Sequence, residues 1–276
     1  LEQSRKEQET LLAELSATQL ELERSLRMRD DFMSLVAHEL RTPLNTLFLE
    51  SQMRMLQLQR GNVEALGPER LPAMIARDQR QIQSMIRLID DMLDVSRIRS
   101  GSLSIRPTDF ELVALLKRVV ADLSLQATGY GSTIKLHPHG PVEGRWDEFR
   151  IEQVVINLLT NALRYGNGKP VDVVVEADAQ QVRIDVIDSG MGISEADQRR
   201  IFEPFERGAG SGAVKGLGLG LAISRQLAEA HGGRLSVTSD GRTGSIFSLV
   251  LPLFASDDIT ANAAAAAEAA SYRPVQ

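Results

Sequence analysis

The chain has 276 residues, of which 43% are hydrophobic and 25% are charged, and its net charge is −6. This length allows two domains with separate cores, and the lack of a concentrated Lys/Arg cluster disfavours nucleic acid as a partner. The chain has no cysteine, which excludes disulfides, thiolate catalysis and cysteine-ligated zinc. No apolar run is long enough to cross a membrane. We expect a cytoplasmic fragment of a longer protein, which leaves membrane attachment through upstream segments open.

Residues 1–60 are predicted to form one long helix. Steps of three and four residues from Leu12 onward find apolar side chains at seven of nine positions, which is typical of a coiled-coil seam. Pro43 lacks an amide donor and predicts a bend just after His38. We assign residues 1–30 to a coiled-coil signalling helix.

A second amphipathic helix is predicted at residues 69–99, after a break at residues 61–68 that contains two glycines and a proline. Two long helices joined by a short loop form a hairpin, and its apolar stripe is too broad to remain exposed. We therefore expect dimerisation into a four-helix bundle and assign residues 31–100 to this domain. The stripe on the second helix consists of Ile75, Ile82, Met85, Ile86, Ile89, Met92, Leu93 and Ile98.

Strands and helices alternate from residue 101 to residue 254, which indicates an α/β sandwich. The Ala-rich residues 255–276 are predicted to be a disordered tail. Strands are expected at 103–105, 133–137, 171–177, 181–187, 235–238 and 245–251, and helices at 110–127, 146–165, 194–201 and 221–230.

His38 and Glu39 lie side by side between apolar positions of the first helix. A neutral imidazole has a lone pair that can accept a phosphoryl group, and a carboxylate that holds the other ring N–H makes this lone pair more nucleophilic. Thr42 is one turn beyond His38 and shares its face, within reach of a water beside the imidazole. A lone histidine on a bundle surface is more often an ordinary solvated residue, so this motif decides nothing by itself.

Three amide side chains, Gln153, Asn157 and Asn161, repeat every four residues and line one face of the predicted helix 146–165. Mg²⁺ prefers hard oxygen ligands and keeps water and phosphate oxygens beside them, so this row fits a Mg²⁺–phosphate site that Arg164 can also reach. The alternative is that the amides cap neighbouring strands. Two asparagines inside a helix lower its propensity, which favours a functional role.

Asp188, Gly190 and Gly192 follow directly after a predicted strand. The carboxylate can accept a hydrogen bond from the exocyclic amine of adenine, which guanine does not offer there, and the glycines let the backbone approach the base. This pattern is also common in ordinary turns.

Alternating glycines at residues 216–220 open the predicted helix 221–230. Their backbone N–H groups and the positive end of the helix dipole attract phosphate, although the spacing matches neither the P-loop nor the dinucleotide fingerprint. Residues 202–205 precede a Gly-rich segment, 207–215, that carries two cations and is predicted to be a lid over phosphates.

These motifs occur in one order between residues 30 and 253, and in this order they closely resemble the two-component sensor histidine kinases. The resemblance implies a dimeric helical hairpin followed by an ATP-binding domain of the Bergerat fold. It also implies ATP and Mg²⁺ as ligands and an enzyme that phosphorylates its own His38. A separate response regulator then receives the phosphoryl group on an aspartate, and phosphatase activity toward that regulator is compatible with the family.

By this resemblance, His38 is the phosphoacceptor, Glu39 is its base, and Thr42 positions water for dephosphorylation of the partner. Asn161 holds Mg²⁺ with help from Asn157. The remaining predicted ATP contacts are Arg164, Tyr165, Asp188, Gly190, Gly192, Phe205, Lys215, Gly216, Leu217, Gly218, Leu219 and Gly220.

Two other functions remain open. A conformational ATPase, as in DNA gyrase B, MutL and the heat-shock chaperones, needs a carboxylate near the asparagines to activate water, for which Glu148 and Glu152 are candidates. A pseudokinase would act as a dimeric scaffold. The histidine motif on a coiled-coil hairpin argues against the first, and the intact pocket motifs argue against the second.

The remaining histidines have simpler interpretations. His137 and His139 form an H-x-H pair without a third ligand nearby in sequence, so we assign no metal to them. His231 precedes two glycines at a predicted helix end, which indicates a C-cap.

Overall fold

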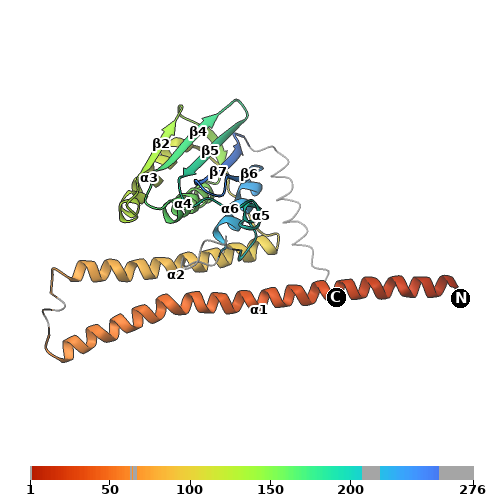
Figure 1. Cartoon of the computed structure of the whole chain (residues 1–276), viewed down its shortest axis with the longest axis horizontal. Helices are drawn as coiled ribbons and strands as arrows, with labels where there is room; N and C mark the ends of the chain where they lie inside the picture. Colours follow the sequence, from red (N-terminus) through yellow and green to blue (C-terminus); the bar gives the residue numbers. More distant parts are fainter. Residues whose placement is uncertain (1, 63, 65–66, 207–217, 255–276) are drawn as a thin grey trace. The chain divides into compact units, whose positions relative to one another are not determined.

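The structure is a computed structural model that describes residues 2–62, 64, 67–206 and 218–254; parts of the first helix are described by their backbone alone. The chain divides into two compact units, Leu1–Ile89 and Asp90–Gln276 (Figure 1). The boundary lies inside the second helix, earlier in the chain than the division after residue 100 that the sequence predicts. Among the described residues, no helix has the length and apolar character needed to span a bilayer.

The first unit contains a helical hairpin. Helix α1 runs from Glu2 to Gln59, and helix α2 runs from Leu71 to Arg99. Both helices match the predicted ones closely. Pro43 lies inside α1 without ending it, and the helix curves in its second half (Figure 1). The histidine motif therefore lies on one uninterrupted helix.

A group of ion pairs ties α1 to α2. Arg54 donates from Nη1 to Asp78 Oδ2 at 2.5 Å and from Nη2 to Asp78 Oδ1 at 2.7 Å. Glu50 forms ion pairs with two arginines: its Oε1 lies 2.6 Å from Arg77 Nε, and its Oε2 lies 3.3 Å from Arg54 Nη2. The hydrogen bond from Arg54 holds the pKa of Asp78 below its ordinary value. A bidentate pair between two helices fixes their register.

Large apolar side chains on both hairpin helices remain exposed in the single chain. Monomeric proteins seldom expose a contiguous stripe of this kind. The exposed residues include Leu44, Phe48, Leu49, Met53, Ile75, Ile82, Ile86 and Ile89.

The second unit is built on a five-stranded sheet with the order β2-β4-β5-β7-β6. Strands β2 and β4 pair in parallel, and the other neighbours are antiparallel. The strands are β2 (Ile134–Pro138), β4 (Val171–Ala177), β5 (Gln181–Asp188), β6 (Arg234–Ser239) and β7 (Ser245–Pro252).

Three helices pack on one face of this sheet (Figure 1). They are α3 (Leu112–Gly129), α4 (Glu148–Tyr165) and α6 (Gly220–Ala230), and a short helix α5 (Glu195–Arg200) follows β5. Alternate residues of β5 are fully buried, as period-two patterning requires of a strand covered on one side. The helical hairpin followed by an α/β sandwich confirms the predicted fold class.

One predicted strand is wrong. Residues 103–105 contain no strand, and β1 lies instead at Thr108–Glu111, where it pairs antiparallel with β3 at Glu143–Trp146. Trp146 is therefore the last residue of a strand, and α4 begins two residues later than predicted.

The aromatic pair Phe110 and Trp146 accounts for this small sheet. Their ring centroids are 5.5 Å apart in an edge-to-face arrangement, and the indole N–H donates to Pro252 O at 2.7 Å. The Trp146 ring occupies the space that a Cβ on Gly144 would need, 2.1 Å away. The glycine that makes this contact possible also removes the β-propensity signal from the strand.

Asp94, near the end of α2, makes a buried ion pair within the second unit. Arg150 Nη1 and Gln153 Nε2 each donate to Asp94 Oδ2 at 2.8 Å, and Arg150 Nη1 also donates to Gln153 Oε1 at 2.9 Å. Asp94 and Arg150 are both buried. The last turns of α2 are thus attached to the first turns of α4 through charges removed from water.

His231 caps the end of α6 as predicted and also contacts α4. Its Nδ1–H donates to Leu227 O at 2.7 Å, and its Nε2 accepts from the backbone N–H of Asp147 at 3.0 Å. Burial lowers the pKa of His231. The imidazole is therefore held neutral by its surroundings, because a second ring proton would face the Asp147 N–H.

Substitution of Asp94 by Ala should lower the free energy of unfolding of the second unit by about 3–5 kcal/mol, because Arg150 would stay buried without its carboxylate. Native-state hydrogen exchange of the β5 amides measures this free energy. The matched control is Asp90→Ala, an exposed residue one turn earlier, with an expected change below about 0.5 kcal/mol. Equal effects of the two substitutions would contradict the importance of the buried pair.

The stability of the second unit should fall as the pH drops below about 6.5, the ordinary pKa of histidine. The unfolded chain binds a proton at His231 there, whereas the folded chain resists it, so protonation favours unfolding. Urea unfolding at pH 7.5, 6.5 and 5.5, followed by the fluorescence of Trp146, the single tryptophan of the chain, tests this. His231→Gln should flatten the dependence, whereas His137→Gln, which removes an exposed imidazole, should retain it.

Candidate functional site

The histidine motif is exposed on α1. The side chain of His38 is 72% exposed, and its Nδ1 lies 3.4 Å from Glu39 Oε1. Thr42 Oγ1 donates to the carbonyl oxygen of His38 at 3.2 Å. The three predicted residues thus lie together, with the carboxylate on one ring nitrogen and the other nitrogen available to solvent.

Asp188 ends β5 as a buried carboxylate with two donors. Gly190 N donates to Oδ1 at 2.8 Å, and the hydroxyl of Ser245 donates to Oδ2. Ser245 begins β7 and is the register partner of Asp188 across the sheet. Ser245 could not be predicted as a site residue, because the register between strands separated by two helices and a further strand leaves no local sequence pattern.

The segment after Asp188 packs closely against the end of α4. A Cβ on Gly190 would lie 2.1 Å from Tyr165 O, so only glycine fits there. Gly192 has φ +74°, which also favours glycine. Lys169 Nζ donates to Ser189 O at 2.9 Å from the loop after α4. Tyr165, Asp188 and Gly190 are therefore neighbours, as a common site requires.

The amide row of α4 meets the first turns of α6. Asn157 Nδ2 donates to Ser224 Oγ at 2.9 Å, and Asn161 Nδ2 lies 3.5 Å from Asn157 Oδ1. A Cβ on Gly220 would lie 2.3 Å from Asn157 Oδ1. The partner of Asn157 is thus a helix residue rather than a strand end, and Gln153, the first amide of the row, bonds Asp94 instead.

A backbone hydrogen bond joins the residues on either side of the predicted lid. Phe205 N donates to Gly218 O at 3.1 Å, and both residues have positive φ, +71° and +68°. Leu219 is buried at the start of α6. Three predicted contacts, Lys215, Gly216 and Leu217, lie outside the described residues, as does the rest of the lid.

Most predicted pocket residues that the structure describes gather around the second half of α4. Asp188 and Gly190 approach its end, Gly220 approaches its middle, and Arg164 is exposed on its last turn. A buried carboxylate, amide side chains and a helix N-terminus can bind an adenine nucleotide with its phosphates. In the described ranges, no cluster of three His, Cys, Asp or Glu side chains suits a metal ion. A cation at Asn161 would therefore need phosphate oxygens and water as further ligands, as Mg²⁺ prefers.

The two carboxylates considered as a base for water lie at the other end of α4. Arg118 Nη2 contacts Glu148 Oε1 at 2.8 Å and Glu152 Oε2 at 3.5 Å. Asn161 is nine positions beyond Glu152 on the helix, a rise of roughly 13.5 Å. This arrangement does not favour a water-activating carboxylate beside Asn161.

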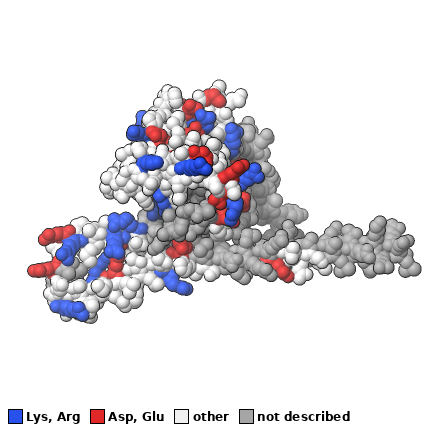
Figure 2. All heavy atoms as spheres, in the orientation of Figure 1, with Lys and Arg blue, Asp and Glu red and all other residues white. Residues whose placement is uncertain are grey.

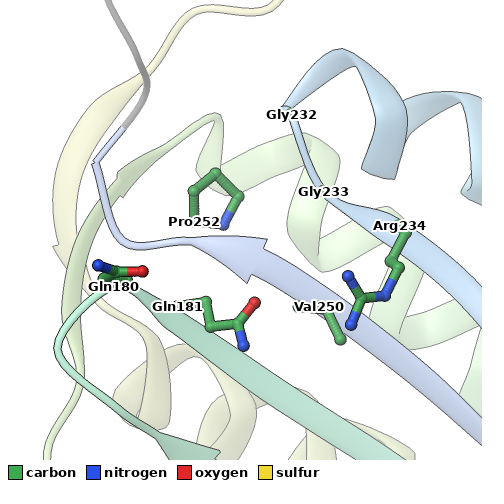
Figure 3. A pocket seen from close by; sticks show the side chains of 7 residues that line it. All are labelled: Gln180, Gln181, Gly232, Gly233, Arg234, Val250 and Pro252. Carbon is green, nitrogen blue, oxygen red and sulfur yellow. The ribbon is translucent and has the colours of Figure 1, made fainter.

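A hollow elsewhere in the unit has a volume of about 320 Å³ (Figure 3). It lies at the end of β5 opposite to Asp188, and it contains none of the predicted site residues. Its lining consists of Gln180, Gln181, Gly232, Gly233, Arg234, Val250 and Pro252.

Charged side chains are mixed over the visible face of the described residues. Figure 2 shows Lys and Arg interspersed with Asp and Glu, without a broad patch of one sign.

Two family models match the sequence. The phosphoacceptor model, His Kinase A, matches residues 28–101, and the model described as "Histidine kinase-, DNA gyrase B-, and HSP90-like ATPase" matches residues 146–255. The virulence sensor protein BvgS of Bordetella bronchiseptica is 34% identical over 257 residues, which cover 90% of this chain and 20% of BvgS. The chain spans about a fifth of the length of the first curated relatives that it matches.

Two solved structures share the fold. Full-length ShkA, crystallised in complex with AMPPNP, has a TM-score of 0.58 and 26% identity, and the match covers 69% of this chain and 40% of ShkA. The histidine kinase ThkA in complex with the response regulator TrrA has a TM-score of 0.54 and 25% identity, and the match covers 81% of this chain and 61% of ThkA.

Replacement of Gly220 by Ala should weaken binding of an adenine nucleotide at least about tenfold, because the new Cβ would displace the Asn157 amide from its place beside α6. Calorimetric titration with Mg-ADP measures the loss. Gly140→Ala is the control, since nothing lies within 4 Å of the Cβ it would add. Unchanged affinity in Gly220→Ala would show that Asn157 is not held for the ligand.

Proposed function

Because the chain belongs to the two-component sensor histidine kinases, we propose that it transfers the γ-phosphoryl group of ATP to its own His38. The observation that carries this proposal is the exposed imidazole with a carboxylate at Nδ1, on a chain whose second unit has the fold of an ATP-binding domain. The two parts complement each other. His38 can accept a phosphoryl group but needs a donor, and a bound ATP can donate one but needs an acceptor.

The proposed chemistry at His38 follows from its contact with Glu39. With Nδ1–H donated to the carboxylate, the lone pair is on Nε2 and can attack the γ-phosphorus. The N–P bond forms as the bond to the β–γ bridging oxygen breaks, and ADP leaves with the electron pair. As positive charge develops on the ring, the Nδ1 proton moves to the carboxylate of Glu39, which thereby acts as the general base.

Binding of ATP is assigned to the second unit. Asp188 accepts from the adenine amine, while its own two hydrogen bonds keep the carboxylate in place. Asn161 is the proposed Mg²⁺ ligand beside Asn157, and bound Mg²⁺ neutralises phosphate charge. Arg164, Tyr165, Phe205 and residues 215–220 complete the proposed contacts.

The exposed apolar stripe of the hairpin supports a homodimer. Burying it against a second hairpin gives a four-helix bundle, with His38 left on the outside. We propose residues 1–30 as the signalling helix, 31–100 as the dimerisation and phosphoacceptor part and 101–254 as the catalytic part, all in the cytoplasm.

The proposed acceptor of the phosphoryl group is an aspartate on a separate response regulator. An exposed phosphohistidine can be approached by such a protein. Thr42 remains the candidate for positioning water in the reverse, phosphatase reaction, because its hydroxyl bonds the His38 carbonyl one turn away and keeps lone pairs free to hold water.

Incubation with γ-labelled ATP and Mg²⁺ tests the proposal. We expect a label on the protein that is labile in acid and stable in base, as a phosphohistidine is. His38→Gln should remove it, and Asn161→Ala should abolish it while the fold is retained. The control is His139→Gln, which should label normally, because His139 bonds Val175 O within the second unit and belongs to none of the predicted motifs.

The same experiment distinguishes the alternatives. Steady release of phosphate without labelled protein would indicate a conformational ATPase, and neither label nor release would indicate a scaffold. Normal labelling in Asn161→Ala would contradict the Mg²⁺ assignment, while labelling in His38→Gln would contradict the phosphoacceptor assignment.

A further inference from the structure

Three segments meet beside Asp188: the loop Ser189–Ile193, the short helix α5, and the turn between β6 and β7. They come from separate parts of the chain, yet two polar side chains join all of them. These are Ser239, the last residue of β6, and Gln198 on α5.

The hydroxyl of Ser239 uses its full hydrogen-bonding capacity. It accepts from Ile193 N at 2.9 Å and from Gly241 N at 3.2 Å, and it donates to Gly244 O at 2.5 Å. A hydroxyl has one donor and two lone pairs, so nothing is left over. Ser239 therefore binds the Asp188 segment to both sides of the β6–β7 turn.

Gln198 completes the arrangement from α5. Its Nε2 donates to Ile193 O at 3.0 Å and to Ser239 O at 2.8 Å. Both backbone groups of Ile193 are thus bound to side chains, the N–H to Ser239 and the C=O to Gln198. Ile193 therefore has both backbone groups hydrogen-bonded, as a residue inside a sheet does, although it lies in a loop.

The backbones also approach too closely for side chains. A Cβ on Gly192 would lie 2.4 Å from Arg242 N, and a Cβ on Gly244 would lie 2.0 Å from Asp188 O. The turn thus packs directly on both ends of the segment that follows β5. A shift of the turn would move Gly190 and Gly192 with it.

We propose that Ser239 and Gln198 form a clamp that positions the segment Asp188–Ile193 for the adenine base and so sets the affinity for nucleotide. The inference rests on the proposed ATP site and extends it to two residues outside its motifs. Neither side chain needs to touch the ligand, so both are positioning residues. Loss of the Ser239 hydroxyl leaves three backbone groups without this partner, and the segment would rearrange.

Ser239→Ala tests the clamp in the full chain. We expect the Kd for Mg-ADP and the KM for ATP to rise about tenfold, because the adenine segment is no longer held. The rate of His38 labelling at saturating ATP should stay within about twofold of the parent, because the groups at His38 are untouched. Ser239→Thr, which keeps the hydroxyl, should recover most of the affinity.

A second variant and a control distinguish loss of the clamp from misfolding of the unit. Gln198→Met keeps the length of the side chain but removes both donors, and it should also raise the Kd. Ser236→Ala removes an exposed hydroxyl from the same strand and should change nothing. Thermal unfolding of each variant shows whether it folds.

The possible results decide between the clamp and the proposed function. If the parent binds no Mg-ADP, the proposed function itself fails. If the parent binds but Ser239→Ala and Gln198→Met bind equally well, only the clamp is wrong. The clamp would also be overturned if the labelling rate at saturating ATP fell by as large a factor as the Kd rose. That pattern would indicate disruption of the whole unit rather than of nucleotide binding.

Discussion

A carboxylate taken out of water needs hydrogen-bond donors, and in this chain Asp188 finds them on two neighbours. Ser245 stands opposite to it across the β5–β7 pair, and Gly190 follows it in the chain. Gly190 must lack a side chain, because Tyr165 O lies where its Cβ would be. One buried charge therefore brings together the end of β5, the start of β7 and the end of α4.

The two units divide the proposed chemistry between them. His38 and Glu39 are exposed on a long helix, where a protein partner can reach them, whereas Asp188 is buried in a sheet. A phosphoacceptor must be accessible, and a base-recognition group must exclude water. One surface cannot satisfy both demands, which gives a physical reason for placing them in separate units.

The sequence predicted the features that repeat locally. The hairpin helices follow from three-four periodicity, and the strands β4 and β5 follow from β-branched residues. Features that depend on distant segments were not predicted. Asp94 and Arg150 are 56 positions apart, and nothing in the local sequence around either residue indicates that they pair.

Gly144 shows why β3 was missed, since a strand of four residues with glycine carries little β signal. The prediction for Gln153 shows a second limit of sequence patterns. The four-residue repeat grouped it with Asn157 and Asn161, but its side chain bonds Asp94. Periodicity identifies a shared face, but the neighbour on that face changes along a helix. At its start α4 faces Asp94, and further along it faces Ser224.

The place of Trp146 has a spectroscopic consequence. It is the single tryptophan of the chain, it is buried between Phe110 and the end of β7, and its indole N–H is bound to Pro252 O. The hairpin has neither tryptophan nor tyrosine. Intrinsic fluorescence of the intact chain therefore reports on the sheet-containing unit alone, while ellipticity is dominated by the long helices. Two optical signals from one sample can follow the two units separately.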